Sequence, residues 1–153
     1  MKKAYQFTIP LSLALLFMLG CALETKLADY QPKSAEEAEV VQFVTECDRF
    51  YQNKDWPKVF DCLHDDAKIR IDIVGAGFSR AMVSKPELIK YVEGGKGDIP
   101  ERSGILNPKI SMAGDRATIK FSHHEDSFII IETWDLVKEN EKWKITRSDW
   151  DWH

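Results

Sequence analysis

Apolar and polar residues follow two different periods along this chain, and the change of period divides it in two. Between residues 34 and 63, apolar residues recur every three to four positions, which is typical of amphipathic helices. Val40, Val44, Cys47 and Tyr51 have the spacing of one buried helical face. From Lys109 onward the period is two, which indicates strands with one buried face. Helices first and strands last predict an α+β fold.

Start and stop signals delimit three helices. Ser34, with Glu37 three residues later, has the pattern of a capping box, in which each side chain binds the other residue's backbone amide. Asn53-Lys54 breaks the helical pattern, and Asp55 begins a second, shorter helix. Pro57 is tolerable there because first-turn amides have no helical partner. A second capping-box pattern begins the third helix, which two glycines end (Ser84, Glu87, Gly94 and Gly95).

Strands are expected on both sides of the third helix. Residues 67–74 follow Asp65-Asp66 as a strand, and residues 75–78 form a turn. After a loop at 97–108, four stretches of period two are joined by short turns, so neighbouring strands run antiparallel. The stretch 128–131 is apolar on both faces, which predicts a central strand that is covered on both sides.

Composition limits the classes to which the protein can belong. Its 153 residues are enough for one domain with a hydrophobic core, and 44% of them are hydrophobic. The formal net charge is −4, and it becomes −6 without the first 20 residues, which hold Lys2 and Lys3 but no acid. Basic residues form no stripe or cluster, so we predict no nucleic-acid partner.

The first 20 residues have the features of an export signal, because two lysines precede an apolar run that is too short to span a bilayer. Met18-Leu19-Gly20-Cys21 resembles the lipobox of bacterial lipoproteins, in which a small residue precedes the cysteine that receives acyl chains such as palmitate. The resemblance implies a signal peptide at 1–20, an acylated Cys21 at a membrane and a flexible tether up to residue 33. Ala22 implies the outer membrane, on its periplasmic side, in a bacterium with two membranes. An ordinary secretory signal or an uncleaved anchor is the alternative.

Cys47 and Cys62 lie at similar distances before and after the turn at Lys54, so antiparallel helices joined there would bring them towards each other. Export would place both thiols in an oxidising compartment, where a disulfide is permitted. Two buried free thiols that fill core space are the alternative. The sequence leaves both open, because it shows neither a distance nor a Cβ direction.

Several segments together resemble the nuclear transport factor 2-like (NTF2-like) superfamily. They are a helix–turn–helix that leads through Asp-Asp-Ala into a strand, a third helix and a closing hairpin (FYQNKDWPKVFDCLHDDAKIRI, SKPELIKYV and WDLVKENEKWKITRSD). The resemblance covers residues 34–149 and implies helices on the concave face of a curved, mainly antiparallel sheet, which together enclose a cone. It leaves the role open, because the superfamily contains ketosteroid isomerases, SnoaL-like cyclases and non-catalytic binding or assembly domains.

The resemblance also implies where a catalytic base would lie. In the isomerases and cyclases an aspartate commonly follows the pattern Asp-Asp-Ala-x-apolar-x. Ile71 occupies that position here and Asp72 comes one residue later, on the other strand face unless a β-bulge inverts it. His123, on the same strand face as Phe121, is the second acid–base candidate.

The cone lining is expected to come from the inward faces of the first helix and the sheet. An aromatic wall with one titratable group could hold a flat apolar ligand. The predicted pocket residues are Tyr51, Phe60, Phe78, Phe121, His123 and Trp134. The alternative is a packed core with His123 at its rim.

The remaining polar clusters have weaker patterns. Neighbouring strand residues point to opposite faces, so His123 and His124 cannot easily share a metal ion. An alternating trio at the end of the chain would share a face, but chain ends fray, and we predict no metal site (Asp149, Asp151 and His153). Trp150 and Trp152 either pack in the core or contact a partner. No motif indicates a cofactor.

We therefore expect a membrane-tethered envelope lipoprotein whose domain, residues 34–153, is a binding module. It would bind a small apolar ligand in the cone or an envelope protein on the open sheet. One alternative is an isomerase- or cyclase-type enzyme that uses His123 or Asp72 as its acid–base group. The other is an assembly subunit of an envelope complex. The superfamily resemblance also implies a homodimer that forms through the sheet.

Overall fold

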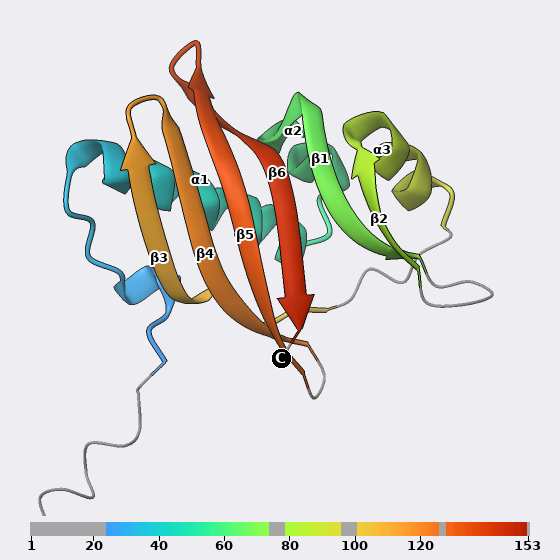
Figure 1. Cartoon of the computed structure of the whole chain (residues 1–153), viewed down its shortest axis with the longest axis horizontal. Coiled ribbons are helices and arrows are strands. Elements are labelled where there is room, and N and C mark those ends of the chain that lie inside the picture. Colours follow the sequence, from blue (N-terminus) through green and yellow to red (C-terminus); the bar gives the residue numbers. More distant parts are fainter. Residues whose placement is uncertain (1–23, 74–78, 96–100, 126–127, 153) are drawn as a thin grey trace, which may run out of the picture.

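A computed structural model describes residues 24–73, 79–95, 101–125 and 128–152. In these residues, three α-helices lie on one side of a curved six-stranded sheet (Figure 1). The helices are α1 (Ala35–Gln52), α2 (Trp56–Cys62) and α3 (Lys85–Glu93). The strands are β1 (Leu63–Ile73), β2 (Ser79–Ser84), β3 (Leu106–Ala113), β4 (Arg116–Glu125), β5 (Phe128–Glu139) and β6 (Lys142–Trp152). The predicted α+β class and its helix-covered curved sheet are confirmed.

The sheet has the strand order β2-β1-β6-β5-β4-β3. Strands β3 to β6 form the predicted antiparallel meander, and β1 joins it beside β6 in the one parallel pairing among the described strands. Strand β2, which the sequence did not predict, pairs antiparallel with residues 68–73 of β1. The sequence predicts that strand residues 128–131 are buried on both faces of the sheet, and this prediction is wrong for the first two. Phe128 and Ile129 are 54% and 45% exposed, because they lie in the β4–β5 hairpin at the end of the sheet.

The core lies between α1 and the sheet. Ser34 caps α1 through its Oγ, which accepts a hydrogen bond from the amide of Glu37 at 3.1 Å. Of the predicted helical face, Val40 and Val44 are fully enclosed and Cys47 is buried, while Tyr51 is only partly buried. The three buried residues pack in one cluster with β4 side chains such as Phe121. Burial of this apolar face is what holds α1 against the sheet.

The segment that precedes α1 is also packed onto the domain. Leu27 is buried in a short 3₁₀ helix, and its amide donates to the carbonyl of Ile105 at 3.0 Å. Thr25 and Asn107 exchange hydrogen bonds through the backbone and the Asn107 side chain. The hydroxyl of Tyr30 donates to the buried carboxylate of Glu37 at 2.7 Å. The structure thus places residues 25–30 in the domain, where the sequence predicts a flexible tether up to residue 33.

The ends of the other helices follow their sequence signals with small differences. Asp55 stands at the start of α2, but its carboxylate pairs with Lys58 at 2.7 Å instead of capping the helix. Strand β1 begins at Leu63, four residues before the predicted start, and is irregular up to Lys68. Both halves of the capping box at Ser84 are present. The predicted turn at 75–78 lies outside the described residues. No helix in the described ranges is both long enough and apolar enough to cross a membrane.

Candidate functional site

A cluster of buried polar side chains lies between α1 and the sheet, and Glu132 is at its centre. Glu132 is 7% exposed. Its Oε2 accepts a hydrogen bond from Nη1 of Arg102 at 2.9 Å and lies 3.4 Å from Nε2 of His123. Its Oε1 accepts hydrogen bonds from Oγ of Ser148 at 2.8 Å and from Nε1 of Trp134 at 2.5 Å. Both carboxylate oxygens are therefore bonded inside the protein, as a buried charge requires.

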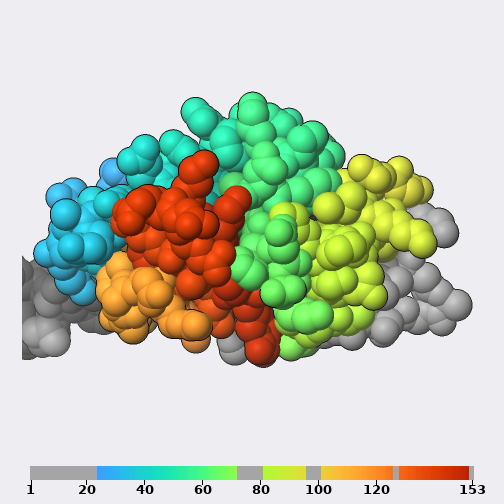
Figure 2. Space-filling view, turned by 90° about the horizontal axis from the view of Figure 1, so that it is seen from above, coloured from blue at the N-terminus to red at the C-terminus, as the bar shows by residue number. Residues whose placement is uncertain are grey.

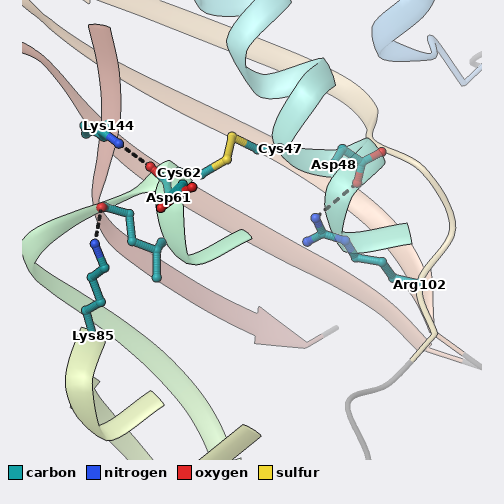
Figure 3. The surroundings of a disulfide bond; sticks show 8 residues. Cys47, Asp48, Asp61, Cys62, Lys85, Arg102 and Lys144 are labelled. Atoms are coloured by element: carbon teal, nitrogen blue, oxygen red, sulfur yellow. Dashed lines mark hydrogen bonds and ion pairs between the residues drawn. A yellow bond between two sulfur atoms is a disulfide. The ribbon is translucent and has the colours of Figure 1, made fainter. Parts of the chain in front are cut away.

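Strand alternation and one loop residue assemble this cluster. His123 on β4 and Glu132 on β5 occupy inward positions, because the buried residues of both strands alternate with more exposed ones. Arg102 comes from the loop before β3, and its side chain is 6% exposed. Its Nη2 donates to Oδ1 of Asp48 on α1 at 3.1 Å (Figure 3). Arg102 thus ties the helix layer to the sheet.

Two aromatic rings flank the guanidinium of Arg102. Its Cζ lies 4.1 Å from the ring centroid of Tyr51 and 5.5 Å from that of Trp134. Such cation–π contacts add to the ion pairs when the cation is shielded from water. Burial raises the pKa of Tyr51 to about 12, although the charge of Arg102 opposes the shift, so the phenol stays neutral.

The carboxyl of Glu132 is ionised over the physiological pH range. Burial alone raises its pKa, but the charge of Arg102 and the bonds from His123 and Trp134 outweigh burial and lower the pKa from 4.5 to about 2. Glu132 therefore cannot serve as a general acid near neutral pH. Arg102 faces two carboxylates, those of Asp48 and Glu132, so its charge is already compensated.

Two nitrogen atoms of the cluster are buried without a hydrogen-bond partner among the described residues. They are Nδ1 of His123 and Nε of Arg102. A buried polar atom left unpaired destabilises a protein by about 1–3 kcal/mol, so a molecule that bonds to it gains that free energy on binding. Nε2 of His123 faces a carboxylate, so in the neutral imidazole we assign the ring proton to Nε2, and Nδ1 then has a lone pair.

The predicted pocket residues are only partly brought together. The ring centroids of Phe121 and Trp134 lie 5.1 Å apart in an edge-to-face contact, and those of Phe121 and His123 lie 6.3 Å apart. Tyr51 joins them through Arg102. Phe60 is a partly buried residue of α2 that packs against the hydrophobic core. Phe78 lies outside the described residues.

Of the polar members of the cluster, the sequence analysis identified His123 but not Glu132 or Arg102. Ile130, Glu132 and Trp134 occupy successive inward positions of β5. An acidic residue on the apolar face of a period-two pattern could therefore have indicated a buried carboxylate. Arg102 follows no periodic pattern, and nothing in the sequence alone connects it with Asp48 or Glu132.

The other sequence candidates lie elsewhere. β1 and β2 pair without a break from Lys68 to Ile73, so no bulge in that pairing shifts the register at Asp72, whose side chain lies outside the described residues. Ile71 packs against the core. The exposed His124 lies 3.0 Å from Glu24, and Asp149 pairs with Arg70 and Arg147. His153 and Cys21 lie outside the described ranges, and within those ranges no three potential ligands gather for a metal ion.

The C-terminal tryptophans are described only in part. Trp150 is half-buried, and its Nε1 donates to the carbonyl of Arg70 at 3.1 Å. This bond joins the end of β6 to β1. The side chain of Trp152 lies outside the described residues, so its predicted role in a contact stays a prediction.

A disulfide joins Cys47 of α1 to Cys62 of α2, with 6.2 Å between the two Cα atoms (Figure 3). The two half-cystines line a groove of about 570 Å³ between the α1–α2 pair and the β5–β6 hairpin, which lie side by side in Figure 2. Phe43, Phe50 and Trp143 add apolar lining. Four acidic and four lysine side chains also line the groove, so it has no net preference for either sign of charge (Glu39, Glu46, Asp61, Glu141, Lys58, Lys138, Lys142 and Lys144).

The sequence matches no family model and no curated protein. Solved structures match the fold. An NTF2-like protein of unknown function from Pseudomonas putida is 16% identical, with a TM-score of 0.62 over 79% of this chain and 89% of that one. The fold is NTF2-like. The S. rosetta CaMKII hub is 14% identical, with a TM-score of 0.59 over 76% of this chain and 95% of that one. The beta subunit of benzoate 1,2-dioxygenase from Burkholderia mallei is 14% identical, with a TM-score of 0.53 over 81% of this chain and 93% of that one.

These NTF2-like neighbours differ in role, since one has no known function, one is a hub and one is an enzyme subunit. At such identities the NTF2-like fold is what they share with this chain. The predicted homodimer and envelope partner stay predictions.

Proposed function

We propose that this protein is an envelope lipoprotein, acylated at Cys21, whose NTF2-like cone binds a small, neutral and mostly apolar molecule. The anchor is supported by the two lysines, the apolar run and the Gly20-Cys21 junction. Intact-mass spectrometry of the mature protein tests it. We expect a chain that begins at Cys21 and carries the mass of its acyl groups. An unmodified N-terminus elsewhere would contradict the anchor.

The observation that carries the binding proposal is the unpaired Nδ1 of His123 within an aromatic wall. A hydroxyl group of a ligand would donate to this nitrogen, and the neighbouring rings would contact the apolar body of the ligand. The ligand is neutral because Arg102 is already compensated by Asp48 and Glu132. An anion would bring a further negative charge into a site shielded from water, which is unfavourable.

Calorimetric titration with 4-methylphenol as the probe tests this site. The His123→Phe variant removes Nδ1 and keeps an aromatic ring, and we expect it to bind at least about tenfold more weakly, which corresponds to roughly 1.4 kcal/mol. His124→Phe is the matched control, because His124 is exposed on the opposite strand face. 4-Methylbenzoate should bind more weakly than the phenol. Equal binding to wild type and His123→Phe would contradict the assignment.

An acid–base enzyme is the second candidate, and the same nitrogen favours it. A lone pair on Nδ1, with Glu132 fixing the proton on Nε2, is the arrangement that allows a histidine to accept a proton from a substrate. Conversion of a β,γ-unsaturated ketone into its conjugated isomer can be followed by ultraviolet absorbance. Turnover by wild type that His123→Phe abolishes and His124→Phe retains would support an enzyme over a binding module.

A further inference from the structure

The N-terminal segment meets the sheet beside an exposed apolar hairpin. The carboxylate of Glu24 lies 3.0 Å from Nε2 of His124, near the end of β4. His124 is directly opposite Ile129 in the β4–β5 pairing. Because residues opposite each other on neighbouring strands project from the same sheet face, Ile129 and His124 are side-chain neighbours. The entry point of the chain is therefore next to Ile129.

Exposed apolar side chains are concentrated at this hairpin. Phe128 is 54% exposed and Ile129 is 45% exposed, and they are consecutive residues. Met82, at 40%, is the other large apolar side chain with such exposure among the described residues, and it lies on β2 at the far edge of the sheet. Figure 1 shows the N-terminal segment (blue) and the β4–β5 hairpin (orange) at one end of the sheet, opposite the β5–β6 hairpin.

The chain between the anchor and this hairpin is short. Three peptide units connect Cys21 with Glu24, and a fully extended chain covers at most about 3.6 Å per residue. The acylated residue therefore lies within about 11 Å of Glu24. Since residues 25–27 are hydrogen-bonded to residues 105–107, the domain cannot move farther from the membrane without breaking those bonds.

We propose that Phe128 and Ile129 insert into the surface of the bilayer that holds Cys21, so that the β4–β5 end of the sheet faces the lipid. This inference rests on the proposed acylation. Attachment to a membrane through acyl chains becomes stronger when a second apolar part of the same protein enters that membrane. The neighbouring side chains Glu24 and Glu125 are acidic, so insertion of apolar groups, and not attraction to anionic headgroups, supplies the contact. The β5–β6 hairpin and its groove then face away from the lipid.

Depth-dependent quenching tests the insertion. The full-length acylated protein is reconstituted in phosphatidylcholine vesicles that contain lipids with a quencher on the acyl chain, and a fluorophore is attached to an introduced cysteine. Ile129→Cys is compared with Met82→Cys, a position of similar exposure. We expect quenching at position 129 to exceed that at position 82 by at least threefold, with no dependence on salt. Equal quenching at both positions, with the protein on the vesicles, overturns the insertion.

Two further variants separate failure of the insertion from failure of the anchor. Cys21→Ser removes the acyl chains, and if the wild-type chain itself proves unacylated, the proposed anchor fails. For the Cys21→Ser protein we expect residual vesicle binding that Phe128→Ser with Ile129→Ser lowers about tenfold and Met82→Ser leaves unchanged. Circular dichroism verifies that the variants fold. If the double variant instead turns a dimer into a monomer while position 129 stays unquenched, the hairpin is a contact between two copies and the lipid assignment is overturned.

Discussion

Arg102 and His123 reach the same oxygen of Glu132, at 2.9 Å and 3.4 Å. The three side chains come from a loop, from β4 and from β5, and Arg102 continues to Asp48 on α1. One buried carboxylate therefore connects the sheet with the helix that covers it. The arrangement also fixes the orientation of the imidazole, which makes His123 suited to bind a ligand or to accept a proton.

Acid should weaken the fold through Glu132. Its pKa is lowered from 4.5 to about 2 on folding, so the stabilisation is fully present above pH 4.5 and is lost as pH falls towards 2. The shift corresponds to a loss on the order of 3 kcal/mol in the free energy of unfolding. Urea titrations between pH 7 and pH 2 measure it.

Glu132→Gln is the control for this pH dependence, because other carboxylates with lowered pKa values titrate in the same range. The variant should be less stable at pH 7 and should lose less stability than wild type between pH 4.5 and pH 2. Parallel pH profiles for both proteins would show that Glu132 does not titrate as the structure implies.

Reduction of the disulfide should destabilise the domain. The bond closes a loop with a sequence separation of 15 residues, for which restriction of the unfolded chain is worth about 3 kcal/mol. We expect a lower denaturation midpoint in the presence of a reductant. The Cys47→Ala, Cys62→Ala double variant should have this lower midpoint with or without the reductant. If the denaturation midpoint of the wild-type protein is the same with and without the reductant, the result would contradict a stabilising disulfide.

The segment before α1 should contribute to stability as part of the domain. Leu27→Ala removes a buried side chain and should lower the free energy of unfolding by about 2–3 kcal/mol. Tyr30→Phe, which loses the hydrogen bond to Glu37, should lower it by about 1 kcal/mol. Lys33→Ala, at an exposed side chain of the same segment, is the control. If Leu27→Ala unfolds at the same denaturant concentration as wild type, residues 25–30 act as a tether after all.

The parts of the fold that the sequence predicts are those whose signals are local. Ser34 and Glu37 mark the start of α1 within one turn, and the spacing of Val40 and Val44 identifies its buried face. The turns of the meander are equally local. The exception is Phe128. The apolar run that begins there predicts burial on both faces of the sheet, but the residue lies in a hairpin at the exposed end of the sheet.

The candidate site was harder to predict because its contacts are long-range. Arg102 bonds to residues 30 and 54 positions away, from a loop that has no period. Leu27 is buried because its segment is hydrogen-bonded to Ile105, which is distant in the sequence. The residues next to Leu27 in the sequence are mostly polar, so they gave no sign that it is buried. His123 could be found because it shares a strand face with Phe121, but its carboxylate partner depends on how β4 and β5 pair.

The imidazole of His123 offers the most direct test of the binding account. Its two ¹⁵N chemical shifts, recorded during a titration with 4-methylphenol, report on each ring nitrogen separately. We expect the Nδ1 resonance to move with ligand concentration and to saturate, while the Nε2 resonance, from the nitrogen that faces Glu132, changes much less. If the His123 ring resonances stay unchanged, whether or not those of His124 respond, the result would contradict a ligand site in the cone.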